Sequence, residues 1–235
     1  MLEFISHASS SAGNLYEVRD GYARLLIDCG VSWPQLKRAL EHRVTQLDGV
    51  LLTHAHGDHS RAVRDVGRAG VNVYASRETI AALGVNGHRM HKVAADQAFT
   101  VGSWRVKPFE VPHDDEGTLG FLVEGISRQK LFFATDCAYL PVRWPADTRI
   151  LAIECNWDPA LLREAEAVHA RRVLQSHMSL PRLLKSLAAN DLSGVREIWL
   201  LHLSDDHSDE AAFKDAVERA TGKVVKVAPR ISEAA

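Results

Sequence analysis

The chain has 235 residues, of which 46% are hydrophobic and 25% are charged, a balance typical of a folded globular protein. Its formal net charge is -2 at pH 7, so overall charge gives no support to nonspecific binding of nucleic acid or membranes. The three cysteines are an odd number and lie far apart in the chain, which disfavours a disulfide framework. Neither a signal peptide nor an apolar run of bilayer-spanning length is found. We therefore expect one domain over residues 1–235, in the cytoplasm and without membrane contact.

The predicted elements are strand-rich with helices interspersed, in two halves of similar make-up. The first half is predicted to contain strands at residues 2–5, 15–18 and 24–27, a helix at 34–42, a strand at 49–53, a helix at 60–68, a strand at 71–75 and a helix at 77–83. The second half is predicted to contain strands at 99–111, 119–123 and 131–135, helices at 159–175 and 181–190, a strand at 198–201, a helix at 209–221 and a strand at 223–227. Ligand-type residues stand at several predicted strand ends, where sheet-based enzymes collect polar groups.

The clearest pattern is a cluster of ligand-type side chains directly after a predicted buried strand: His54, His56, Asp58 and His59. The two alternate histidines project to the same side, and Gly57 permits a turn that brings the other two to a neighbouring position. Imidazole with one carboxylate suits Zn²⁺, Mn²⁺ or Fe better than Ca²⁺ or Mg²⁺. The alternative is a polar loop with histidines clustered by chance, which without a metal leaves costly polar groups to satisfy. The sequence therefore predicts a metal site.

This cluster resembles the His-x-His-x-Asp-His motif of the metallo-β-lactamase superfamily. Four further segments resemble that family's other motifs, in the family's order: residues 25–30, 111–114, 133–136 and 200–204. The resemblance covers essentially the whole chain. It implies an α+β fold, a four-layer αββα sandwich, in a single domain without a large inserted domain.

The resemblance also implies two divalent metal ions, Zn or Mn, with Fe as another possibility. Seven residues match the family's ligands: His54, His56 and His113 for one ion, Asp58, His59 and His202 for the other, and Asp136 shared between them. The chain departs from the family after the shared aspartate, where a small residue and glycine often stand and Cys137 and Ala138 occur here. For the Cys137 thiol a packing role is favoured over a role beside the metals.

Within the superfamily, the chain is most similar to the small YycJ/WalJ-type exonuclease-like proteins. Residues 9–14, 154–158, 176–180 and 201–204 carry this similarity, although residues 176 and 180 depart from the pattern. In the serine-rich turn at residues 9–14, Ser9, Ser10 and Asn14 are candidates for contacting a substrate phosphate, and the alternative is that the turn only connects a hairpin. His177 is a candidate general acid or phosphate contact, and the alternative is a helix-capping or buried structural role.

The function implied by this resemblance is hydrolysis of a phosphodiester by a hydroxide that bridges two metals. Asp58 and His177 are the expected catalytic residues, and the expected substrate is nucleic acid, DNA rather than RNA, degraded from an end. Two alternatives stay open. One is a small-molecule metallo-hydrolase, acting on a phosphodiester, thioester or lactam. The other is a nucleic-acid-binding module that retains metal for its structure.

Overall fold

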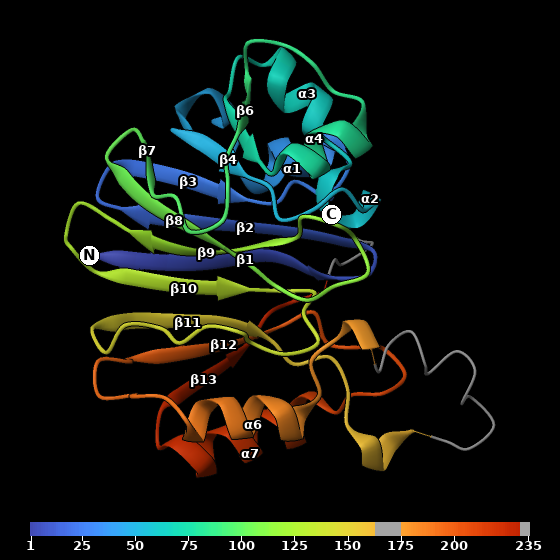
Figure 1. Ribbon diagram of the computed structural model, residues 1–235, viewed down its shortest axis with the longest axis vertical. Coiled ribbons are helices and arrows are strands. Elements are labelled where there is room, and N and C mark those ends of the chain that lie inside the picture. The colour runs from blue at the N-terminus through green and yellow to red at the C-terminus, as the bar shows by residue number, and fades with distance from the viewer. Residues whose placement is uncertain (163–174, 231–235) are drawn as a thin grey trace.

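Two β-sheets form the centre of the molecule, and helices cover the outer face of each sheet (Figure 1). The computed structural model describes residues 1–162 and 175–230. Within these residues the first sheet has the order β1-β2-β3-β4-β5-β6 and the second the order β13-β12-β11-β10-β9-β8-β7. The four-layer αββα sandwich predicted from the sequence is therefore confirmed, and none of the described helices is long and apolar enough to cross a membrane.

The strands divide between the sheets at the middle of the chain. The first sheet comprises β1 (Leu2–Ser10), β2 (Gly13–Asp20), β3 (Ala23–Ile27), β4 (Gly49–Leu51), β5 (Val73–Ala75) and β6 (Met90–Lys92). The second comprises β7 (Phe99–Val101), β8 (Trp104–Glu110), β9 (Leu119–Glu124), β10 (Lys130–Ala134), β11 (Thr148–Glu154), β12 (Glu197–Leu201) and β13 (Val224–Val227).

The helices likewise separate into two groups (Figure 1). The first sheet carries α1 (Trp33–Ala39), the short turn η1 (Val44–Gln46), α2 (Gly57–Ser60), α3 (Val63–Arg68) and α4 (Arg77–Leu83). The second carries η2 (Pro159–Leu161), α6 (Leu180–Ala188) and α7 (Glu210–Thr221). Sequence signals mark the ends of these helices: Ser76 accepts a hydrogen bond from the backbone of Thr79 at the start of α4, and Gly84 ends it in the left-handed conformation.

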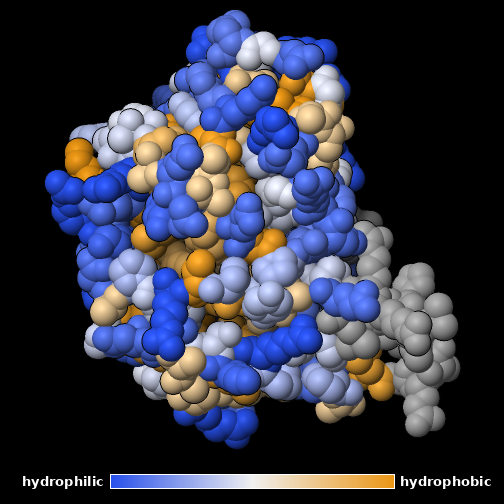
Figure 2. Space-filling model, viewed as in Figure 1, coloured by the Kyte–Doolittle hydropathy of each residue, from blue (hydrophilic) through white to orange (hydrophobic). Residues whose placement is uncertain are grey.

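Apolar side chains hold the layers together. Between the sheets, the Tyr16 and Phe133 rings meet edge to face with centroids 5.1 Å apart, and Trp104 and Phe121 are fully buried beside them. Each sheet also packs on its own helices through a separate core. Figure 2 shows the outcome: hydrophobic side chains gather toward the middle of this face, with hydrophilic ones around the helices at either end. The sheets are thus fixed against each other, and groups at their edges have defined positions.

Parallel strands bring the carboxyl ends of several strands to one edge of each sheet. Strands β3 to β6 run parallel to one another, and so do β10 to β13. Ligand-type residues stand at these ends: Asp28 after β3, His54 after β4, Asp136 after β10, Glu154 at the end of β11 and His202 after β12. Asp28, Asp136 and His202 leave their strands with positive φ values of 59°, 49° and 53°.

The structure differs from the predicted elements in several places. The predicted turn at residues 9–14 is mostly strand, because β1 and β2 pair as far as Ser10 and Gly13. The predicted strand at 99–111 is two strands, β7 and β8, separated by a turn at Gly102, whose φ of +55° suits glycine. The predicted helix at 60–68 is divided between α2 and α3, and strands β6 and β11 were not predicted. Most of the predicted helix at 159–175 lies outside the described residues.

Candidate metal centre

Three histidines converge at the mouth of β4. Atom Nε2 of His54 lies 3.0 Å from Nδ1 of His56, and Nε2 of His113 lies 3.4 Å from the same atom. The remaining ring nitrogen of His113 faces the carbonyl of Ser176 at 3.2 Å, and that of His54 faces the Thr53 hydroxyl at 2.9 Å. If Nδ1 of His113 and Nδ1 of His54 carry the protons and donate to these oxygens, Nε2 of each ring keeps its lone pair. A neutral imidazole with a free lone pair is the form that binds a metal. Burial lowers the pKa of His54, which also favours its neutral form.

A second group lies beside the first and contains Asp58, His59 and His202. Nε2 of His59 is 3.4 Å from Oδ2 of Asp58, and Nε2 of His202 is 3.7 Å from the same oxygen. Nε2 of His202 is buried and has no hydrogen-bond partner among the described residues. A buried imidazole nitrogen without a partner is costly, and it fits a position that a cation would occupy. The donors therefore suit a metal ion chemically.

Asp136 connects the two groups. Its Oδ2 is 3.0 Å from Nε2 of His59, and its donor atoms also cluster with those of His54 and His202. Burial opposes the charged form of His202, but Asp136, Asp58 and Glu154 together raise its pKa to about 10. A divalent cation competes with the proton for such a nitrogen, because only neutral imidazole binds metal.

Asp28 supports His59 from the side away from the cluster. Its Oδ2 accepts a 2.8 Å hydrogen bond from Nδ1 of His59, and its Oδ1 accepts from the backbone and hydroxyl of Thr53, both at 2.9 Å. Burial raises the pKa of the Asp28 carboxyl, and His59 and Thr53 oppose that shift. The pairing fixes Nε2 of His59 as the lone pair that faces Asp58 and Asp136. Asp28 was not among the predicted site residues, although it follows an apolar strand as His54 does.

Helix α2 carries Asp58 and His59 and packs very closely against the end of β3. The amide of Cys29 donates to the carbonyl of His59 at 2.8 Å. A Cβ on Gly30 would lie only 1.6 Å from the carbonyl oxygen of Asp58, so the backbone approach requires glycine. Gly57, where the sequence predicted a turn, is the first residue of this helix.

His177 lies at the same centre and is held by Glu154. Its Nδ1 is 2.6 Å from Oε1 of Glu154, and its ring stacks on that of His202 with centroids 5.4 Å apart. The other Glu154 oxygen accepts from the backbone amides of Cys137, at 2.7 Å, and Met178, at 3.2 Å. Burial lowers the pKa of His177, but Glu154 and Asp136 together more than offset burial, and the pKa lies above its usual range. Glu154 was not a predicted site residue, although it ends a strongly apolar strand.

Two of the three predicted substrate-binding residues, Ser9 and Asn14, contact the candidate ligands. Ser9, Ser10 and Asn14 are all buried. The Ser9 hydroxyl accepts a 2.8 Å hydrogen bond from the amide of His202. The Asn14 side-chain nitrogen lies 2.9 Å from Nε2 of His59 and 3.2 Å from Oδ2 of Asp58. These contacts are made to the candidate ligands themselves, and contact with a substrate phosphate stays a prediction.

Comparisons with known proteins agree with this geometry. The model of a beta-lactamase superfamily domain matches residues 23–203. The chain is 28% identical over 226 residues to exodeoxyribonuclease YycJ of Bacillus anthracis, covering 88% of this chain and 84% of that protein. It is 26% identical over 222 residues to exodeoxyribonuclease WalJ of Streptococcus pneumoniae, covering 86% and 81%. The solved metallo-β-lactamase-fold protein YhfI of Bacillus subtilis superposes with a TM-score of 0.76 at 16% identity, over 97% of both chains.

The family match spans the candidate ligands, from His54 to His202, and the supporting Asp28. The relatives named as nucleases and the clustered histidines and carboxylates together support metal-dependent hydrolysis. The chain belongs to the beta-lactamase superfamily and is a metal-dependent hydrolase of the metallo-β-lactamase fold.

Proposed function

We propose that the protein is a dinuclear metal-dependent phosphodiesterase that removes nucleotides from an end of DNA. The observation that carries this proposal is the pair of adjacent ligand groups joined by Asp136. Two adjoining cation sites suit in-line displacement at a phosphate, where attacking and leaving oxygens both need stabilisation. The names of the relatives, exodeoxyribonucleases YycJ and WalJ, support DNA as the substrate.

The two ions would be held by the residues that the geometry groups together. One set is His54, His56 and His113, the other is Asp58, His59 and His202, and Asp136 serves both. This imidazole-rich set suits Zn²⁺ or Mn²⁺, and Fe also fits. When bound, divalent ions supply Lewis acidity, which lowers the pKa of water and offsets the negative charge of a phosphodiester.

We assign three further roles to side chains around the ions: orienting the attacking water, donating a proton and positioning the ligands. Asp58 has one carboxylate oxygen facing both His59 and His202, so we assign it the orientation of the attacking water. Glu154 binds Nδ1 of His177, which leaves Nε2 to donate a proton to the departing sugar oxygen. Ser9 and Asn14 hold the ligands in place through the His202 amide and the His59 ring.

A substrate panel on protein of measured metal content tests the proposal. Single- and double-stranded DNA and RNA of one sequence, labelled at either end, are incubated with the Mn²⁺- or Zn²⁺-loaded protein. The expected result is stepwise release of mononucleotides from DNA, with the turnover abolished by Asp58→Ala. Asp215→Asn, at an exposed ion pair with Arg219 on α7, is the matched control and keeps activity.

Labelled strands that stay intact while metal occupancy is confirmed would contradict the proposal. Hydrolysis of a small phosphodiester with no action on any strand would favour a small-molecule phosphodiesterase. Metal-dependent DNA binding without turnover, unchanged by Asp58→Ala, would favour a binding module.

A further inference from the structure

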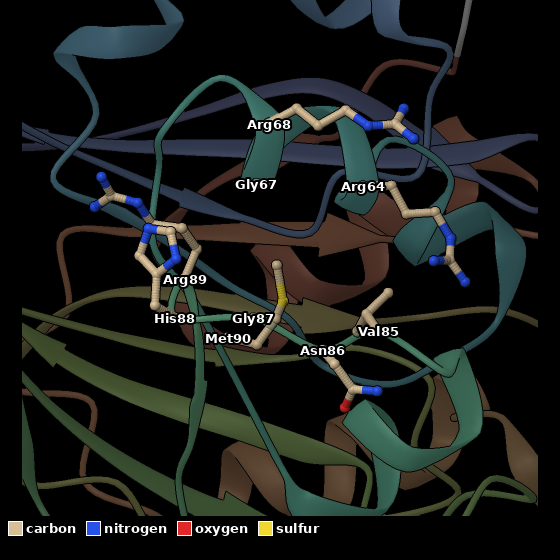
Figure 3. A pocket seen from close by; sticks show the side chains of 9 residues that line it. All are labelled: Arg64, Gly67, Arg68, Val85, Asn86, Gly87, His88, Arg89 and Met90. Carbon is tan, nitrogen blue, oxygen red and sulfur yellow. The ribbon is translucent and has the colours of Figure 1, made fainter.

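A basic pocket lies on the first half of the molecule, away from the residues of the metal centre. It has a volume of about 310 Å³ and is formed by α3 and the loop that leads into β6. Figure 3 shows Arg64 and Arg68 extending from α3 on one side and His88 and Arg89 from the loop on the other, with Met90 between them. Among the residues that the structure describes, no carboxylate lines the pocket. Its charge therefore suits an anion.

The guanidinium groups of the pocket retain unused hydrogen-bonding capacity. One nitrogen of Arg64 donates to the carbonyl of Leu83 at 2.8 Å, and Nη1 of Arg89 donates to Asn72 at 3.1 Å. Nε of Arg89 is buried and has no hydrogen-bond partner among the described residues. Within the described part of the chain, Arg68 pairs only with Asp65, at 3.3 Å, and this exposed ion pair contributes little to stability. Planar guanidinium donors match the oxygens of a phosphate, so the free donors indicate a phosphate ligand.

The floor of the pocket is apolar. Val85 is buried, Met90 is half-buried, and Gly67 lies so close to Met90 that an added Cβ would come within 3.0 Å of its terminal methyl. An apolar floor beneath arginines strengthens their attraction for an anion, because the local dielectric is lower than that of water. It also offers a surface for the sugar or base attached to the phosphate.

The pocket and the metal centre lie at opposite ends of short parallel strands. The candidate ligands follow the carboxyl end of β4, whereas the loop of the pocket precedes the amino end of β6. A three-residue strand spans about 10 Å. Helix α3 begins only three residues after α2, which carries Asp58 and His59. Because a stacked strand advances about 3.4 Å along its axis per nucleotide, a chain of several nucleotides is needed to reach both places.

We propose that this pocket binds a phosphate of the nucleic-acid strand several nucleotides away from the bond that is cut. This inference rests on the proposed nuclease function and names the part of the substrate that the protein holds outside the metal centre. Such a contact favours long strands over short ones and contributes to the salt dependence of binding.

The test compares strand lengths in the metal-loaded protein. The variants are Arg64→Gln, Arg68→Gln and the double variant, with Arg219→Gln on α7 as the control for loss of an exposed arginine. In the double variant, KM for a 20-nucleotide strand is expected to rise about tenfold more than KM for a trinucleotide, the size of one charge-assisted hydrogen bond. The dependence of long-strand binding on salt is also expected to weaken. Arg68→Gln alone serves if Arg64→Gln disturbs α4, because the ion pair of Arg68 with Asp65 is exposed.

Equal changes in KM for both lengths, or none, would overturn the proposal. So would binding of a mononucleotide or inorganic phosphate in the pocket that is as tight as that of the strand, which would indicate an effector site. Fluorescence polarisation with a labelled 20-nucleotide strand and the Asp58→Ala variant separates this result from the nuclease proposal. Loss of affinity on removing the two arginines in that background supports the pocket even if no strand is ever cut.

Discussion

The two halves of the molecule supply the candidate metal centre in different ways. The first sheet delivers four ligand-type residues from one short segment, residues 54–59, which covers the end of β4 and the start of α2. The second sheet delivers its groups from four separate places, at His113, Asp136, His177 and His202. The first set is local in the chain, and the second is brought together by the fold, with Asp136 and His202 following the parallel strands β10 and β12. The histidine and aspartate cluster at residues 54–59 therefore forms the complete candidate two-metal site only when the fold of the second half brings the other groups beside it.

At the candidate metal centre, each half also supplies a buried carboxylate that orients a histidine. Asp28 binds Nδ1 of His59 at 2.8 Å in the first half, and Glu154 binds Nδ1 of His177 at 2.6 Å in the second. The two halves therefore repeat the same device on different histidines. The two histidines differ in their proposed roles: His59 belongs to a ligand group, and His177 is the proposed proton donor.

The largest effect is expected where the halves meet. Asp136→Ala removes the carboxylate that adjoins both ligand groups, and we expect turnover to fall by more than about 100-fold, beyond the loss for a group that only orients a ligand. Metal analysis should show fewer ions per chain. Asp147→Asn, an exposed carboxylate paired with Lys130 in the same sheet, is the control. Full metal content and turnover in Asp136→Ala would show that the two groups act independently.

An intermediate effect is expected from the two orienting carboxylates, and it should differ in kind. Asp28→Asn should weaken metal affinity about 10- to 100-fold, because it disturbs the tautomer of His59. Glu154→Gln should lower kcat about 100-fold with the metal content retained, because it loosens the proposed proton donor. Metal titration and steady-state kinetics on both variants measure this split. The same loss of metal in both variants would remove the distinction between the halves.

The smallest effect on activity is expected at Glu17, on the outer face of the first sheet. Burial raises its pKa, but hydrogen bonds from His7, Arg19 and Arg24 outweigh burial and hold the pKa well below its usual range. A depressed carboxyl pKa stabilises the fold above about pH 4.3 and loses that contribution as pH falls toward the folded-state pKa. Glu17→Gln leaves Arg24 buried without its counter-charge and should lower the free energy of unfolding by about 3 kcal/mol at pH 7.

Urea unfolding at several pH values measures this prediction. The difference between the wild type and Glu17→Gln should shrink as pH falls below about 4, because Glu17 of the unfolded wild type then binds a proton while the folded chain keeps the carboxylate charged, and this lowers the free energy of unfolding of the wild type. Glu3→Gln, at an exposed position on β1, is the control. A difference that stays constant with pH would show that packing, rather than charge, stabilises this part of the first sheet.

Much of the fold was predictable from motif order, and individual strands were less so. The sandwich followed from the order of the family motifs, whereas β6 has no apolar pattern and forms because Met90 pairs with Val73 on β5. Strand β11 did carry a signal, the apolar run from Ile150 to Ile153 that is buried in the centre of the second sheet. Tertiary pairing decides short strands that composition leaves undetermined.

The site shows the same division between local and distant information. The sequence named the candidate ligands through their motifs, but it did not identify Asp28 or Glu154 as their supports. Their histidine partners lie 31 and 23 residues away, so only the fold brings each pair together. Ser9 and Asn14 were expected at a substrate, and the structure places them against His202 and His59. Both residues lie in the paired part of β1 and β2 rather than in an exposed turn. The residue types alone did not show how far these two strands extend.

The left-handed strand ends at Asp28, Asp136 and His202 have a consequence for evolution and engineering. This conformation costs an L-residue on the order of 1 kcal/mol, less for aspartate than for histidine, and glycine adopts it freely. Glycine at these three positions would relieve the backbone strain, but it would also remove the side chains that build the centre. A stabilised version of this protein is therefore best sought elsewhere in the chain, since here stability and chemistry oppose each other.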